Sequence, residues 1–145
     1  MLRALAASLL AVMLVGCGSA PKPGPERPAV NVEQISSIFF GSGYTAPVHI
    51  NVTVQNVHSK PMTLRSVRLE PGAGMGFFSI YPEQREFNLD LGPGEVHTVQ
   101  LVPTAYTNLA RYTPNEPFSV RAIVDVVVEG KRHRQMYLFR DIGRQ

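Results

Sequence analysis

The chain has 145 residues, which is enough for one domain and too few for a second independent core. Lys and Arg number 14 and Asp and Glu number 11, so the formal charge of +3 is too small to indicate a nucleic-acid-binding protein. A single cysteine excludes an intramolecular disulfide framework and a multi-cysteine metal site, while 12 Gly and 12 Pro indicate many turns.

The first segment is typical of a secretory signal peptide. A short basic start, Met1-Leu2-Arg3, precedes an uncharged apolar run over residues 4–15. A helix needs about 20 apolar residues to span a bilayer, and this run is shorter. We therefore expect residues 1–16 to be a cleaved signal peptide rather than a transmembrane anchor.

The end of the apolar run, Leu14-Val15-Gly16-Cys17, resembles the lipobox of bacterial lipoproteins. The resemblance implies cleavage before Cys17, a diacylglyceryl group on its thiol and an acyl group on its new α-amine. Two or three acyl chains, at about 0.8 kcal/mol per buried methylene, would anchor the protein stably. Gly18 stands where an Asp would resemble an inner-membrane retention signal, so in a Gram-negative host the resemblance implies an outer-membrane anchor facing the periplasm. The alternatives are an ordinary signal peptide with an incidental cysteine and a buried apolar helix.

Residues 17–31 are expected to comprise the lipidated cysteine and a proline-rich tether. About thirteen residues of polyproline II, at about 3.1 Å each, would hold a domain up to about 40 Å from the lipid. The segment 25–28 also fits a PxxP ligand for a protein partner, which is the alternative to a spacer. Four closely spaced prolines favour this extended conformation: Pro21, Pro23, Pro25 and Pro28.

Residues 32–145 are expected to form the folded domain, because short apolar runs alternate there with turn-forming residues. The alternation is clearest over 48–54 and resumes at 62 after a turn over 56–61. Its phase slips at Ser66, which predicts a β-bulge. A flexible loop is expected over 71–76 and a long connection over 104–117. Further strands are expected over 77–81, 87–91 and 96–102.

The last two expected strands, 118–128 and 131–139, flank Glu129-Gly130, which is typical of a two-residue hairpin turn. In that register, residues whose numbers sum to 259 face each other. Asp125 then lies opposite Arg134, an opposite-charge cross-strand pair worth about a few tenths of a kcal/mol. Tyr137 and Phe139 fall on the same side as Ala122 and Val120.

Seven or eight strands without a convincing helix predict an antiparallel immunoglobulin-like β-sandwich. The pattern resembles the immunoglobulin-like modules of bacterial surface proteins. The segment 52–69 is similar to the water-stress (LEA14/WHy-like) domains, although Val57 stands where their usual proline follows the asparagine. The segment 91–95, LGPGE, resembles the L-x-PGE corner of several such sandwiches.

The sequence holds no Gly-x-Ser-x-Gly motif, no close pair of metal-binding histidines and no phosphate-binding loop. His49 is expected on the polar face of a strand, His58 in a turn and 83–86 in a solvated loop. We therefore expect a protein that is not an enzyme and that uses no metal ion or cofactor.

Basic residues are concentrated near the end of the chain. The expected register places Arg132, Arg134 and Arg140 on the same face as Arg121. That face is a candidate contact for anionic lipid, lipopolysaccharide or an acidic partner. The alternative is an edge strand that its cations protect against aggregation. Nucleic acid is not expected, because the face carries no stacking aromatics. The candidate contact residues are Arg121, Lys131, Arg132, Arg134 and Arg140.

The leading hypothesis is a non-enzymatic lipoprotein of the cell envelope, anchored in the membrane through Cys17 and acting as an interaction or structural module for a protein partner. One alternative is a subunit that binds a glycan or lipid ligand, with Tyr44 and Tyr81 as the candidate aromatics. Another is an accessory lipoprotein of a secretion or pilus system. Most of the other aromatics near the glycine-rich loops are expected in the core: Phe39, Phe40, Phe77 and Phe78.

Overall fold

The computed structural model describes residues 27–72, 78–107 and 118–143. The described residues form strands and turns, with no helix among them. The ten strands are β1 (Ala29–Gln34), β2 (Thr45–Pro47), β3 (Ile50–Gln55), β4 (Met62–Pro71), β5 (Phe78–Ile80), β6 (Glu83–Leu91), β7 (Val96–Leu101), β8 (Thr104–Thr107), β9 (Phe118–Val128) and β10 (Lys131–Ile142).

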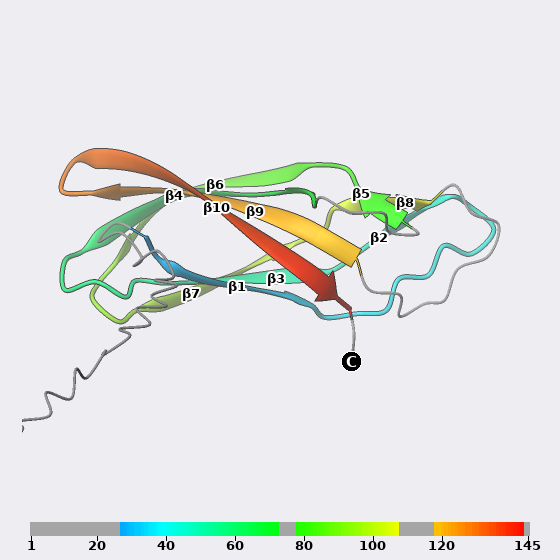
Figure 1. The fold of residues 1–145 in the computed structure, drawn as a ribbon, viewed down its shortest axis with the longest axis horizontal. Helices are drawn as coiled ribbons and strands as arrows, with labels where there is room; N and C mark the ends of the chain where they lie inside the picture. Colours follow the sequence, from blue (N-terminus) through cyan, green and yellow to red (C-terminus); the bar gives the residue numbers. More distant parts are fainter. Residues whose placement is uncertain (1–26, 73–77, 108–117, 144–145) are drawn as a thin grey trace, which may run out of the picture.

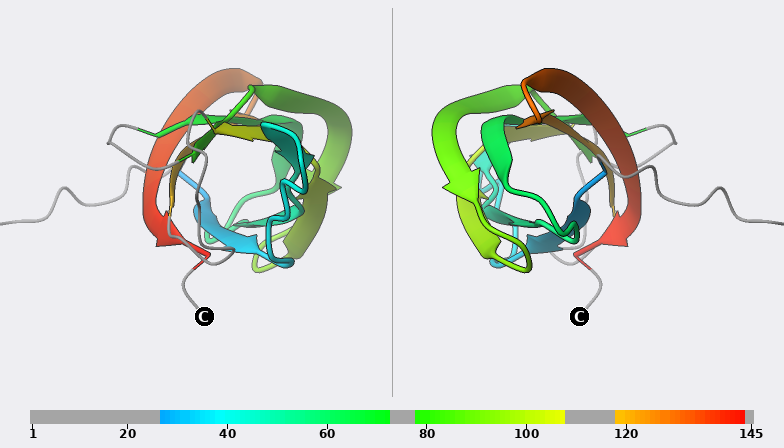
Figure 2. Two further views of the ribbon diagram at one scale, coloured as in Figure 1. Left: turned by 90° about the vertical axis from the view of Figure 1, so that its right-hand side faces the viewer. Right: turned by 90° about the vertical axis from the view of Figure 1, so that its left-hand side faces the viewer.

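The strands form three antiparallel sheets, with the orders β1-β3-β7, β10-β9-β4-β6 and β2-β8-β5. The first two are the layers of a sandwich, and the short third sheet lies at one end of it (Figure 1). Viewed along the long axis, the layers curve around a common interior (Figure 2), with β1 beside β10 and β6 beside β7. The expected antiparallel β-sandwich is confirmed, with more strands than the seven or eight expected.

The additional strands are β1, β2 and β8. β1 begins at Ala29, inside the segment expected to be tether, and pairs along its whole length with β3. β8 occupies the first residues of the connection expected over 104–117, whose residues 108–117 lie outside the described ranges. The loop expected over 83–86 was wrong, because these residues form the first part of β6 and pair with β4.

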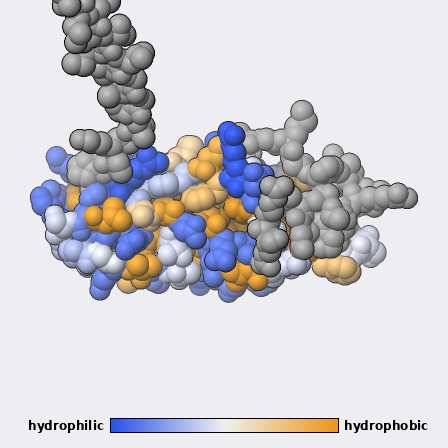
Figure 3. Space-filling view, turned by 60° about the horizontal axis from the view of Figure 1, so that its bottom comes forward, coloured by the Kyte–Doolittle hydropathy of each residue, from blue (hydrophilic) through white to orange (hydrophobic). Residues whose placement is uncertain are grey.

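The core lies between the two layers and is built from the alternating apolar side chains. Ile50, Val52 and Val54 of β3 are fully buried, as are Val120 and Val124 of β9. Each such side chain contributes about 1.5–3 kcal/mol on burial, so these faces hold the layers together. The outer face of β3 is polar, and Figure 3, which brings this side of the molecule forward, shows small hydrophobic patches among hydrophilic residues.

The predicted β-bulge is present in β4. The register of β4 shifts between Leu64 and Ser66 against both of its neighbours, β6 and β9. Leu64 and Val67 are both buried although they are three residues apart. The extra residue therefore keeps the apolar face inward and turns Ser66 onto the outer face, beside Asp125 of β9.

The hairpin between β9 and β10 has the predicted register, with Lys131 opposite Val128 and Arg134 opposite Asp125. Glu129 and Gly130 both have positive φ, at 50° and 76°. Two positive φ values are typical of a type I′ turn, whose twist suits two adjacent antiparallel strands.

A buried asparagine joins two further turns at the same end of the molecule. The Asn56 side chain is fully buried, and its amide nitrogen donates to the carbonyls of Lys60 (2.8 Å) and Leu91 (2.9 Å). Its backbone nitrogen donates to the Glu95 carbonyl (2.9 Å), and its backbone oxygen accepts from Gly94 (2.8 Å). We call this end, formed by the turns 56–61, 92–95 and 129–130, the turn end. The opposite end, formed by β2, β5, β8 and the turn 41–43, is the aromatic end.

Candidate functional site

Asp125 is the centre of an ion-pair cluster on the outer face of the four-stranded sheet. It is only 3% exposed, because Arg132 and Arg134 of β10 lie over it. Arg134 donates to its carboxylate from Nε and Nη2 (3.0 Å each), Arg132 from Nη2 (2.9 Å) and Ser66 from its hydroxyl (3.2 Å). The hydrogen bonds from Arg134 are the main reason that the pKa of the Asp125 carboxyl lies below its ordinary value, and burial opposes them.

The predicted pairing of Asp125 with Arg134 is thus confirmed, and Arg132 joins it. Two of the five candidate cations for an anionic surface therefore share one buried carboxylate, which offsets one of their two positive charges. A third, Arg121, donates to the Pro71 carbonyl (3.3 Å) and lies 3.8 Å from the Glu70 carboxylate.

The remaining two candidate cations, Lys131 and Arg140, lie near opposite ends of β10. Nine residues of strand, at about 3.3 Å each, place them about 30 Å apart. Both are exposed, and neither forms an ion pair within the described part of the chain. The structure therefore distributes the basic residues along the strand, and of these two cations Lys131 lies at the turn end and Arg140 does not.

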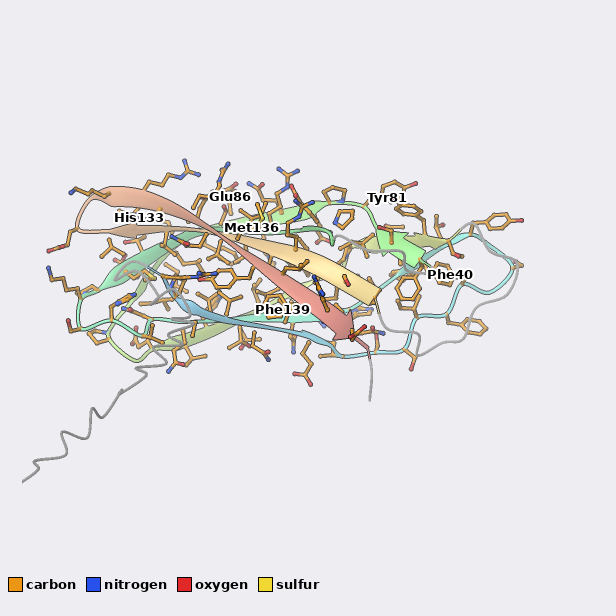
Figure 4. The ribbon with its side chains drawn as sticks, viewed as in Figure 1. Phe40, Tyr81, Glu86, His133, Met136 and Phe139 are labelled. Carbon is orange, nitrogen blue, oxygen red and sulfur yellow. The ribbon has the colours of Figure 1, made fainter. Side chains whose placement is uncertain are left out.

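The aromatic end carries the exposed rings. Tyr44 and Tyr81, the two candidate ligand residues, are 66% and 55% exposed. Tyr81 of the β5–β6 link stacks on Tyr106 of β8, with ring centroids 4.6 Å apart and an angle of 32° between the planes. Phe39 is more exposed still, at 77%. Figure 4 shows Tyr81 at this end of the ribbon and His133 near the other.

Two of the other aromatics considered from the sequence are core residues, as expected. Phe40 and Phe78 are buried, and their ring centroids lie 6.0 Å apart. Phe77 lies outside the described residues. Tyr106 was missed, because it falls in the expected connection, and the four residues of β8 (Thr-Ala-Tyr-Thr) show no apolar alternation that would indicate a strand.

At the turn end, the turn 56–61 and the β9–β10 hairpin border a hollow of about 280 Å³. Glu129 is its only acidic lining residue, and Lys60 Nζ lies 2.5 Å from Glu129 Oε1. The hydrogen bond from Lys60 is the main reason that the pKa of the Glu129 carboxyl is lowered. The hollow is lined by His58, Ser59, Lys60, Val128, Glu129, Lys131 and His133.

The first described residues of the chain are held at this same end. The Tyr137 hydroxyl donates to the Pro28 carbonyl (2.6 Å), and the Arg27 guanidinium lies 4.7 Å from the centroid of the Tyr137 ring. His58 Nε2 lies 3.1 Å from the Arg27 carbonyl. Burial of Tyr137 raises the pKa of its hydroxyl, and the nearby charge of Arg27 opposes this shift. The chain therefore enters the domain at the turn end.

The lipobox residues Leu14, Val15, Gly16 and Cys17 lie outside the described residues. Within the described ranges, no helix is long and apolar enough to cross a membrane. In the same ranges, no cluster of three or more His, Cys, Asp or Glu residues is arranged to hold a metal ion.

No protein-family model matches the chain, and no curated protein matches it. The solved structure described as Northeast Structural Genomics Consortium target SoR45 superposes with a TM-score of 0.51 at 14% identity, covering 80% of this chain and 85% of that one. A protein from Archaeoglobus fulgidus gives a TM-score of 0.45 at 8% identity, covering 78% of this chain and 92% of that one. A Bacteroides uniformis beta-glucuronidase gives 0.41 at 15% identity, covering 77% of this chain and 13% of that one. The first likeness supports the fold alone.

Proposed function

We propose that the protein is a non-enzymatic lipoprotein of the cell envelope, anchored through acylated Cys17 in the outer membrane and facing the periplasm. Its β-sandwich is the module that contacts a protein partner. The observation that carries the proposal is the Leu14-Val15-Gly16-Cys17 motif, which directly follows a short uncharged apolar run.

The attachment of the chain at one end of the domain supports this proposal. Arg27 contacts the turn end through His58, and Pro28 contacts Tyr137 in the middle of β10. The chain advances ten residues from Cys17 to Arg27, which at about 3.1 Å each allows a separation of up to about 30 Å. An anchor at Cys17 would leave the aromatic end, at the far end of the sandwich, available to a partner.

The substitution Cys17→Ser tests the anchor. Wild-type protein from its host should incorporate labelled palmitate, have the mass of a triacylated chain that begins at Cys17, and remain with the outer-membrane fraction. Cys17→Ser should take up no label, and Ser19→Ala, a nearby change outside the motif, should behave as wild type. An unacylated wild-type chain, or an unchanged Cys17→Ser variant, would contradict the proposal.

The stacked tyrosines favour a second candidate function, the binding of a glycan. Sugar rings pack against exposed aromatic faces, and Tyr81, Tyr106 and Tyr44 offer three such rings at one end of the molecule. Glycan-array binding that is lost in Tyr81→Ala and Tyr44→Ala, and retained in the control Met136→Ala on β10, would support this function. Binding that all three variants retain would rule out the tyrosines as the site.

A further inference from the structure

We propose that the hollow at the turn end binds a phosphate group. The assignment of that phosphate to a lipid headgroup rests on the proposed function, because it requires the anchor at Cys17. The phosphate site itself rests on the residues that line the hollow.

The walls of the hollow present cationic and imidazole donors. Lys60 and His58 come from the turn 56–61, and Lys131 and His133 from the start of β10. Amine and imidazole N–H groups that converge from separate segments are the donors that phosphate oxygens accept. A volume of about 280 Å³ corresponds to roughly nine waters at about 30 Å³ each, which accommodates a phosphate group with part of its hydration.

The one carboxylate in the walls does not cancel this charge. Glu129 is already paired with Lys60 at 2.5 Å. Lys131 forms no ion pair within the described ranges, so the lining retains its positive charge. An anion entering the hollow therefore meets a net attraction.

His58 is held in place before any ligand binds. Its backbone nitrogen donates to Asn56 Oδ1 (3.0 Å), and Asn56 is fully buried. Its Nε2 lies 3.1 Å from the Arg27 carbonyl, which accepts a hydrogen bond from that nitrogen. This contact, together with the backbone bond to Asn56, fixes the His58 ring as a wall of the hollow. A site whose wall is already fixed loses less entropy when the anion binds.

The position of Arg27 indicates the source of the phosphate. The residue that links the domain to the segment of Cys17 is in contact with a wall of the hollow, through His58. An anchor up to about 30 Å from Arg27 keeps the turn end close to the headgroups of the leaflet that holds the acyl chains. Anionic headgroups attract nearby basic residues with about 1 kcal/mol per lysine.

The membrane arm of the test labels one introduced cysteine at a time, because the native cysteine, Cys17, is acylated in this protein and does not react with the fluorophore. Val57→Cys places a fluorophore at the turn end, and Ser42→Cys places one at the aromatic end. Acylated protein is reconstituted in vesicles of phosphatidylcholine alone or with phosphatidylglycerol, each containing a headgroup-linked quencher. We expect the fluorophore at position 57 to be quenched more strongly in vesicles with phosphatidylglycerol than in phosphatidylcholine alone. At position 42 the quenching should be the same in both kinds of vesicle.

Two variants, each of which removes one positive charge, locate the contact. Lys131→Gln should lower about fivefold the ratio of protein whose turn end contacts the headgroups to protein whose turn end does not, as measured by quenching at position 57. Arg140→Gln is the matched control, since it removes one exposed cation from the far end of the same strand and should leave the ratio unchanged. Equal effects of the two variants would place the contact on the whole face of β10 and overturn the assignment to the hollow.

The soluble arm uses inorganic phosphate with the detergent-solubilised full chain. Phosphate should move the NMR signals of the His58 and His133 rings more than chloride does at equal ionic strength, and Lys131→Gln should weaken the effect. If phosphate shifts the histidine signals but phosphatidylglycerol does not change the quenching, the hollow binds soluble phosphate. If only the quenching changes, and Lys131→Gln reduces that change, the hollow binds the lipid headgroup. If neither arm responds, the proposal is wrong. If the chain carries no acyl groups, it does not float with either kind of vesicle in a density gradient. That result would show that the anchor is wrong, and the phosphate titration would still test the hollow.

Discussion

At the turn end, tight turns are held together by one buried amide, whereas at the aromatic end strands of three or four residues carry exposed rings. Asn56 makes the turn end a small hydrogen-bonded unit with a charged surface. The aromatic end has its buried side in the core, through Phe40 and Phe78, and its other side uncovered. Under the proposed function, the turn end would hold its shape beside the tether and the aromatic end would contact a partner.

The buried amide should give the largest effect. Asn56→Ala removes two donors and leaves the buried carbonyl of Leu91 without its partner. Each unsatisfied buried group costs about 1–3 kcal/mol, so we expect the free energy of unfolding in urea to fall by about 3 kcal/mol. Asn51→Ala, on the half-exposed face of β3, should change it by no more than about 0.5 kcal/mol. Similar losses in the two variants would mean that Asn56 does not hold the turn end together.

Between the two ends, Asp125 should give the next largest effect. Asp125→Asn replaces a carboxylate that accepts from two arginines, and hydrogen bonds to charged groups contribute about 1.5–3 kcal/mol. We expect a loss of about 2 kcal/mol in urea unfolding at pH 7. Asp90→Asn, at an exposed position on β6, should cost less than about 1 kcal/mol.

The effect at Asp125 should depend on pH. Its folded pKa lies below the ordinary value of 3.8, so the unfolded chain binds the proton more tightly. The contribution to stability is complete above about pH 5 and is lost as the pH falls through 3.8 and the lower folded pKa. Wild type and Asp125→Asn should therefore converge in stability towards pH 2, and a difference that stays constant with pH would exclude the carboxylate as its cause.

Regular alternation made part of this fold predictable. The alternation over β9 and β10 sets the hairpin register, and the pairing of Asp125 with Arg134 follows from that register alone. The phase slip at Ser66 likewise predicts the bulge in β4. These features are local, so a single stretch of sequence contains the information that determines them.

The features that could not be predicted depend on distant contacts. β2 has three residues, too few to show an alternation, and β1 is a strand because it pairs with β3. Residues 83–86 are polar because β6 is an edge strand with little of its length buried, and polarity alone suggested a loop. The contacts of Arg27 and the stack of Tyr106 join residues separated by connections whose path the sequence does not specify.

A substitution in the hairpin at the turn end should lower the free energy of unfolding by less than the changes at Asn56 and Asp125, because it affects only the backbone conformation of the turn. Gly130 has a φ of 76°, a region that costs an L-residue about 1–2 kcal/mol. Gly130→Ala should therefore lower the unfolding free energy by about 1 kcal/mol, and Gly130→Asn by less. Gly43 at the aromatic end has an ordinary φ and room for a Cβ, so Gly43→Ala is the control and should be close to neutral. Equal losses at the two glycines would show that the turn end is not the more constrained of the two.

The aromatic end should give the smallest effect on stability. Tyr81 is more than half exposed, so Tyr81→Ala mainly removes the stack on Tyr106, which is worth about 0.5–1 kcal/mol. A double-mutant cycle with Tyr106→Ala isolates that pair energy, because each single change removes the same contact. A coupling within this range would mean that the two rings form a fixed platform before any ligand arrives. A coupling of zero would mean that the rings move independently, and the glycan-binding candidate would then lose the feature that favours it.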